Sequence, residues 1–141
     1  MGRASLLRTG MLLAALGGAA VGAARADDAF YSDAKVTPVI EQALADLPGK
    51  VVSMAVVEYP PGGRTDSHRH AGSHTLVYVL DGELEFQVTG KPVVTLKAGQ
   101  PFYEAPTDIH AVSRNASRTA PAKFLVVFVK DAGSPVLEPA H

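Results

Sequence analysis

The chain has 141 residues, of which 47% are hydrophobic and 19% are charged, and it contains no cysteine. The absence of cysteine excludes a disulfide framework and any thiolate metal ligand. The formal net charge is −1, and no basic stripe or helix-turn-helix segment is present, so the composition argues against a protein that binds nucleic acid.

The first 26 residues have the pattern of a secretory signal peptide. Arg3 and Arg8 form a positively charged start, residues 11–24 are apolar, and Ala-Arg-Ala at 24–26 is a small-x-small cleavage pattern. The apolar run is shorter than the about 20 residues that a membrane span needs, and an uncleaved anchor is the alternative. We therefore expect a mature chain that begins at Asp27, is periplasmic or secreted, and is not bound to a membrane. It would carry ten basic and fourteen acidic residues, in one domain.

Residues 27–50 are expected to form an N-terminal arm with one short helix. Thr37 is a suitable N-cap, and Pro38 suits the first helical position, where a missing N–H has no cost. Apolar residues recur at helical spacing from Val39 to Leu47, and Pro48-Gly49 ends the run. The sequence thus predicts a helix over 37–47.

The chain beyond residue 50 consists of short β-rich runs separated by turn signals. Strands are predicted over residues 51–59, 65–70, 75–80, 84–88, 93–97, 101–104, 110–115 and 124–130. Such regular spacing predicts an all-β sandwich or barrel of antiparallel strands, with a tail over 131–141.

Two of these strands are apolar on both faces, namely residues 75–80 and 124–129. Strands of this kind are usually covered on both sides. One face would line the barrel interior, and the other would need a second sheet, the 37–47 helix or a partner subunit. A homodimer is therefore expected.

The histidines give the strongest indication of function. His68, His70 and His74 lie within seven residues, and His110 follows forty residues after His70. Residues i and i+2 of a strand point to the same face, so a His-x-His pair can direct two imidazoles at one point. Since imidazole suits Zn, Cu, Fe and Ni, the pattern predicts a metal inside a β-barrel.

These residues resemble the two motifs of the cupin superfamily. In the first, Gly62 is followed after five residues by His68-x-His70 and later by Gly82. In the second, Gly99 leads to His110, and Asn115 stands one residue late; Ala105 and Thr107 replace the proline and glycine of the motif. The resemblance covers residues 51–129, most of the expected mature chain.

The resemblance implies an antiparallel double-stranded β-helix, the cupin jelly-roll barrel, over residues 51–130, of the type found in small single-domain bacterial cupins. It also implies one divalent transition metal (Fe, Mn, Ni, Zn or Cu) bound by His68, His70 and His110. A small-molecule ligand or substrate is the implied partner.

The sequence departs from the family at the acidic metal ligand. Counting back from Gly82 puts the family glutamate at Thr75, whereas counting on from His70 puts it at His74. Residues 71–73 read as a loop that resets which face points inward, so strand parity does not decide between them. We expect His74 near the metal; the alternatives are an inward Thr75 with water completing the shell and a solvent-exposed His74.

A site of neutral ligands keeps the full charge of the ion and has no carboxylate of its own to act as a base. We expect Glu104 to be the catalytic acid or base, because it leads into the turn that carries His110; a surface position is the alternative. Phe86 and Tyr103 are expected to wall the cavity, and Arg69 to point outward. The other acidic candidates are Glu58, Glu83 and Glu85.

Three functions are compatible with this reading. The first is a metal-dependent oxidoreductase of the dioxygenase type, which needs an open position on the metal. The second is a non-catalytic exported protein that binds a metal or a small anionic ligand. The third is a metal-free cupin that serves as a structural dimer.

Overall fold

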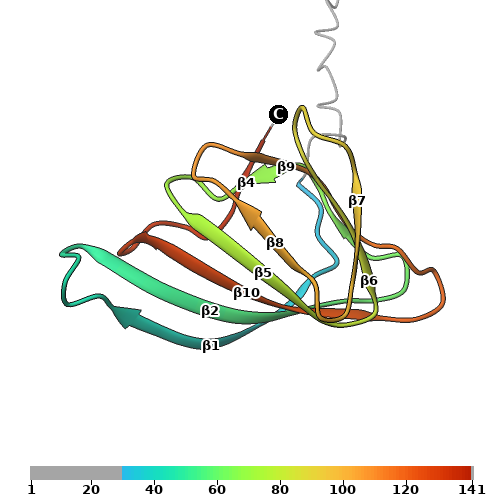
Figure 1. Cartoon of the computed structure of the whole chain (residues 1–141), viewed down its shortest axis with the longest axis horizontal. Helices are drawn as coiled ribbons and strands as arrows, with labels where there is room; N and C mark the ends of the chain where they lie inside the picture. Colours follow the sequence, from blue (N-terminus) through green and yellow to red (C-terminus); the bar gives the residue numbers. More distant parts are fainter. Residues whose placement is uncertain (1–29, 141) are drawn as a thin grey trace, which may run out of the picture.

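The computed structural model describes residues 30–140, which form two facing β-sheets (Figure 1). The strands are β1 (Lys35–Ala43), β2 (Lys50–Tyr59), β3 (Arg64–Thr65), β4 (His68–Arg69), β5 (His74–Asp81), β6 (Glu83–Val88), β7 (Val94–Lys97), β8 (Pro101–Glu104), β9 (Ile109–Asn115), β10 (Ala122–Asp131) and β11 (Glu138–Pro139). No helix occurs within this range, and none of the described residues forms a helix able to cross a membrane.

All strand pairs are antiparallel. The larger sheet has the order β1-β2-β10-β5-β8, and the smaller has the order β11-β4-β9-β6-β7, with β3 also paired to β9. Figure 1 shows β1 and β2 flaring away from the smaller sheet at the left, while the sheets converge at the right. The all-β antiparallel prediction is confirmed.

The predicted strands correspond closely to the observed ones. Seven of the eight runs match one strand each within two residues, and the run at 101–104 coincides with β8. The run at 65–70 is instead divided into β3 and β4 by Asp66 and Ser67.

The predicted helix over 37–47 is wrong, because residues 35–43 form strand β1 and residues 44–49 form a turn. Val39 and Ile40 are β-branched and favour strands. Pro38 is tolerated because β1 is an edge strand whose pairing with β2 shifts register between Pro38 and Ile40.

The core lies between the sheets and is built from inward residues of both. Val79, Leu84 and Phe86 are completely buried, and Phe124, Val126 and Phe128 alternate along β10 toward them. This alternation follows from the two-residue period of a strand.

A tight turn at Gly82 joins β5 of the larger sheet to β6 of the smaller one. Its φ is 76°, and a Cβ there would lie 2.7 Å from the carbonyl oxygen of Pro121. Glycine is required on both counts, for the left-handed backbone and for the close approach.

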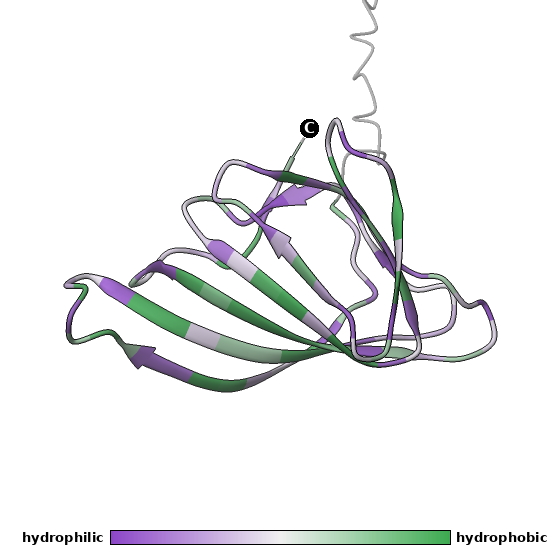
Figure 2. Cartoon of the chain, in the orientation of Figure 1, coloured by the Kyte–Doolittle hydropathy of each residue, from purple (hydrophilic) through white to green (hydrophobic). Residues whose placement is uncertain are grey.

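The outer face of the larger sheet is apolar and uncovered. Figure 2 shows hydrophobic bands across β2, β10 and β5. Leu76 and Tyr78 of β5 are 47% and 48% exposed, and they pair with Val127 and Leu125 of β10. Neither the predicted helix nor a second sheet covers them within residues 30–140.

Candidate metal centre

Three histidines meet inside the barrel, all from the smaller sheet or its edge. His68 lies on β4 and pairs with His110 of β9, and His70 follows β4 directly. Their exposed fractions are 4%, 3% and 9%, and one ring nitrogen of each lies within 4.8 Å of the others. The structure thus brings together the predicted triad in a form that could hold a metal ion.

Backbone carbonyls orient two of the rings. His68 Nδ1 donates to Asp66 O at 2.7 Å, and His70 Nδ1 donates to Val136 O. A carbonyl only accepts, so each Nδ1 carries the proton and each Nε2 is left with a free lone pair. Such a partner on the far nitrogen fixes the tautomer that a metal needs.

The surroundings favour uncharged imidazoles. Burial, helped by the charge of His110, lowers the pKa of His68 from 6.5 to about 4. Burial also lowers the pKa of His70, although Glu104 opposes the shift. Both rings are therefore neutral near pH 7, which is the form that binds metals.

The Glu104 carboxylate lies in the same cluster, as the sequence predicted for its position. It is 2% exposed, with Oε1 3.3 Å from His110 Nδ1 and Oε2 3.9 Å from His70 Nε2. Burial alone would raise the pKa of Glu104, but the adjacent His110 ring, together with the charges of His70 and His68, lowers it below its usual value.

Glu104 reaches this point from β8, directly across from Thr75 of β5 in the strand register. Thr75 is completely buried and points inward, so it takes the place that the family motif gives to a glutamate. A carboxylate is present at the centre after all, supplied by the neighbouring strand.

The cluster contains polar atoms that lack partners. Among the described residues, four buried side-chain atoms make no hydrogen bond: Thr75 Oγ1, Glu104 Oε2, His110 Nδ1 and His110 Nε2. Leaving such atoms unpaired costs about 1–3 kcal/mol each. Imidazole nitrogens and a carboxylate oxygen are suitable donors to a divalent transition metal, so the residues present fit such an ion.

His74 is not part of this cluster, contrary to the expectation that it lies near the metal. It is exposed, and its Nδ1 lies 2.8 Å from the hydroxyl of Tyr103, which is 52% exposed. The turn at 71–73 resets the strand parity, so Thr75 points inward and His74 outward. Tyr103 therefore does not wall the cavity either, whereas Phe86 does.

The remaining acidic candidates lie at the surface in ion pairs. Glu58 faces Lys35 at 3.7 Å and Lys123 at 3.8 Å; Glu83 faces Lys97, and Glu85 faces Arg114. Arg69 is exposed and points outward, as predicted.

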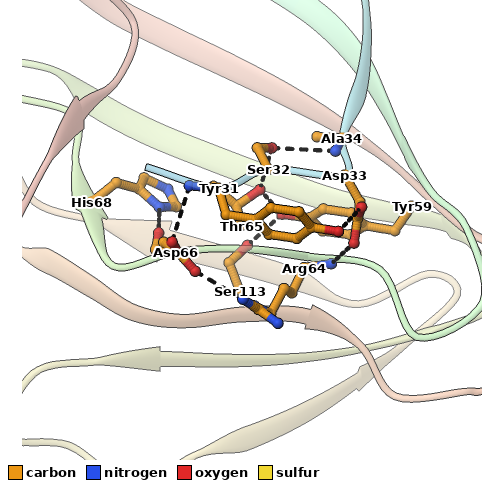
Figure 3. A network of polar contacts seen from close by, with 10 residues as sticks. All are labelled: Tyr31, Ser32, Asp33, Ala34, Tyr59, Arg64, Thr65, Asp66, His68 and Ser113. Carbon is orange, nitrogen blue, oxygen red and sulfur yellow. Dashed lines mark hydrogen bonds and ion pairs between the residues drawn. The ribbon is translucent and has the colours of Figure 1, made fainter. Parts of the chain in front are cut away.

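A cavity of about 220 Å³ extends from the histidines between the sheets, toward a group of hydroxyls. Tyr59 donates to Thr65 Oγ1 at 2.6 Å and lies 2.9 Å from Ser113 Oγ, while Ser32 Oγ lies 2.9 Å from Thr65 Oγ1 (Figure 3). Sequence reasoning missed this group. Strand parity indicates that Tyr59 faces inward with Val57, but nothing in the sequence indicates that the four hydroxyls meet.

Sequence relatives of this chain include two plant proteins. It is 36% identical over 81 residues to germin-like protein subfamily 2 member 2 of Arabidopsis thaliana, covering 55% of this chain and 36% of the relative. It is 31% identical over 97 residues to subfamily 2 member 4, covering 66% of this chain and 44% of the relative. The chain thus spans less than half the length of either relative.

Solved structures share the fold. An oxalate oxidase in complex with the substrate analogue glycolate aligns with a TM-score of 0.58 and 24% identity, over 76% of this chain and 55% of that one. An uncharacterized protein with a double-stranded β-helix domain from Klebsiella pneumoniae aligns with a TM-score of 0.57 and 22% identity, over 82% and 90%. At this identity the likeness concerns the fold alone.

A family model described as a cupin domain matches residues 55–128, more than half of the chain. The match includes the three buried histidines, Glu104 and the cavity-lining residues of β5, β6 and β10. With the topology and the His-x-His motif, it shows that the chain belongs to the cupin family.

Proposed function

We propose that this protein is a metal-dependent oxidoreductase of the dioxygenase type that acts on a small molecule. The observation that carries the proposal is the buried triad of His68, His70 and His110, with unpaired polar atoms around it. Three ligands leave open positions on a divalent ion, and a cavity adjoins the triad. In such a reaction both atoms of O₂ enter the substrate, so no external reductant is needed.

The chain's own residues have defined tasks in this proposal. His68 and His70 would present Nε2 to the ion, because their Nδ1 protons are held by carbonyls. The bound metal supplies Lewis-acid or redox chemistry at this point. Glu104 is the one acidic residue lining the cavity, so we assign it the role of accepting a proton from the substrate.

The test begins with metal content. The untagged mature protein, loaded in turn with Fe, Mn, Ni, Zn and Cu, should hold about one ion per chain of at least one of them by mass spectrometry. The His68→Ala/His70→Ala double variant should hold none. O₂ uptake is then measured on the loaded protein across phenolic and thiol substrates. Glu104→Gln is expected to reduce it even when excess metal restores one bound ion per chain.

A non-catalytic binding protein is the second candidate. It is favoured by the position of Glu104, since three imidazoles and one carboxylate can saturate a four-coordinate ion. One bound ion with no O₂ uptake and a saturated coordination spectrum would support this function instead. Absence of metal under all loading conditions would contradict both candidates and leave a structural cupin.

We also propose that the protein is exported after cleavage behind Ala26. The signal-peptide pattern of residues 1–26 lies outside the described residues and rests on the sequence alone. Expression of the full chain in a Gram-negative host should give a periplasmic product whose N-terminal sequence begins at Asp27. Recovery of the uncut chain from the cytoplasm would contradict export.

Finally, we propose that a second copy of the chain covers the outer face of the larger sheet. Leu76, Tyr78 and Tyr103 are about half exposed there, on neighbouring strands β5 and β8. Large exposed apolar patches on a sheet usually mark an interface. Light scattering should give a dimer, and Tyr78→Lys should give a monomer that keeps its metal; a wild-type monomer at micromolar concentration would contradict the proposal.

A further inference from the structure

The cavity beside the histidines has a distinctive chemical lining. Besides the histidines, its polar side chains are Glu104 and the hydroxyls of Ser32, Ser53, Tyr59, Thr65 and Ser113. No lysine, arginine, asparagine or glutamine lines it. Lys130 is the only buried lysine or arginine among residues 30–140, and it is occupied by Ser134 O at 2.8 Å and Glu41 at 3.8 Å.

This lining is poorly suited to a small anion away from the metal. A carboxylate ligand needs hydrogen-bond donors or a counter-charge to offset the loss of its hydration. The only acidic or basic side chain besides the histidines in the cavity lining is Glu104, which carries the same sign as the ligand. An uncharged ligand has no such cost and gains from apolar contact.

One wall of the cavity is aromatic and connects its two ends. Ring centroids of Tyr59 and Phe124 lie 5.8 Å apart, those of Phe124 and Phe86 5.6 Å, and those of Phe86 and His110 4.6 Å. This row of rings therefore runs from the cluster of hydroxyls around Tyr59 to the candidate metal centre at His110. Such a wall suits the faces and edges of a flat ring.

At the end of the cavity near Tyr59, one hydroxyl oxygen can still accept a hydrogen bond. The single proton of Tyr59 is donated to Thr65, so the bond between Tyr59 and Ser113 must be donated by Ser113 (Figure 3). The proton of Ser113 is then committed, while its oxygen still has lone pairs. Ser113 also lines the cavity, so it can accept a hydrogen bond from a ligand.

We propose that the cavity binds an uncharged, mainly apolar molecule of about one substituted ring, which donates a hydroxyl hydrogen to Ser113. The volume of about 220 Å³ lies below the usual range for larger ligands and limits the molecule to this size. That the other end of the molecule faces a metal rests on the proposed function; the ligand class itself does not.

The test uses four probes on the metal-free and the zinc-loaded protein, with affinity measured by calorimetry and ligand-observed NMR. The probes are 4-methylphenol, 4-methylanisole (in which the hydroxyl hydrogen is replaced by methyl), glycolate and oxalate. The metal-free protein should bind 4-methylphenol most tightly and neither anion. Tighter binding of glycolate or oxalate than of 4-methylphenol by the metal-free protein would overturn the proposal.

Variants locate the binding site. Ser113→Ala should weaken binding of 4-methylphenol about three- to tenfold and leave 4-methylanisole unchanged. Tyr78→Phe removes a tyrosine hydroxyl from the outer face and is the matched control, with no effect on either probe. Ala55→Leu, which fills the cavity from β2, should abolish binding of both probes. Equal weakening of both probes by Ser113→Ala would contradict the proposed hydrogen bond. Full binding by a folded Ala55→Leu variant would show that the ligand binds outside this cavity.

The outcomes separate this inference from the proposed function. If no metal binds but 4-methylphenol does, the ligand class stands and the oxidoreductase does not. If a metal binds and O₂ uptake occurs without any affinity for 4-methylphenol, the function stands and the ligand class is wrong.

Discussion

The strand pair β5 and β8 carries a histidine-containing cluster near each of its two faces. On the inner face, Thr75 and Glu104 lie opposite each other beside the buried triad. On the outer face, His74 stacks on Tyr103 with ring centroids 6.1 Å apart and bonds to its hydroxyl. The outer pair is exposed and its two side chains are hydrogen-bonded to each other. The inner cluster is buried and contains polar atoms without hydrogen-bond partners.

This difference shows what distinguishes a candidate metal site from histidines that are only close in sequence. Proximity in sequence places His74 only four residues from His70, yet the two rings point to different environments. Water already satisfies an exposed imidazole, so an ion gains little there. The buried cluster has a desolvation cost that an ion can offset.

The largest expected effect separates the two clusters by metal content. His110→Ala should reduce bound metal from about one ion per chain to background, because it removes one of three inward ligands. His74→Ala should leave the stoichiometry unchanged, because its ring lies on the outer face. Mass spectrometry of the purified, metal-loaded variants is the measurement. Loss of metal in His74→Ala would contradict the assignment of the ion to the buried cluster.

The second effect concerns the two residues of β8. Glu104→Gln should weaken metal affinity about 10–100-fold, since the carboxylate lies against two of the proposed ligands. Tyr103→Phe should have no effect, because its hydroxyl faces His74 outside. Competition with a chromogenic chelator measures the metal affinity of both variants. Equal affinities in Glu104→Gln and wild type would show that Glu104 does not contribute to metal binding.

The third effect is on thermal stability. A metal that binds only the folded chain adds about 2.7 kcal/mol at a free concentration of 100 Kd, which corresponds to a rise in Tm of roughly 10 °C for a domain of this size. His74→Ala should show the same rise on metal addition and His110→Ala none. Differential scanning fluorimetry with and without a chelator gives the comparison, and a rise in His110→Ala would indicate a metal bound elsewhere.

The fourth effect, spread over more than two pH units, is the acid sensitivity of the metal-free protein. The pKa of His68 is about 4 in the folded chain and about 6.5 when unfolded, so the unfolded chain binds more protons between these values. The contribution of His68 to stability is therefore complete above pH 6.5 and is lost as the pH falls toward 4, by up to about 3 kcal/mol. Urea unfolding across this range should show a shallower loss in His68→Asn than in His74→Ala; identical slopes would contradict a buried, neutral His68.

The sequence was most informative where local patterns determine the structure. Runs of β-branched and aromatic residues between glycine and proline turns predicted β2, β5, β6 and β10 to within two residues. Local patterns failed at residues 37–47, where the apolar spacing suits a helix but pairing with β2 produces a strand. Helical spacing there was misleading because tertiary context outweighs it.

The site was predictable in part for the same reason. The His-x-His motif placed His68 and His70 on one face, and His110 joined them through the family motif. The choice between His74 and Thr75 depended on the backbone of the loop at 71–73, which no residue type determines. The pairing of Thr75 with Glu104 is a long-range register, so the sequence could suggest Glu104 but not its partner.

The two carbonyls that orient the rings differ greatly in sequence distance. His68 is held by Asp66, two residues away, while His70 is held by Val136, 66 residues later. During synthesis the first contact can form as soon as β4 emerges, but the second must await all strands from β5 to β10. The orientation of His68 is thus a local property of β4, whereas that of His70 depends on a residue that follows β10.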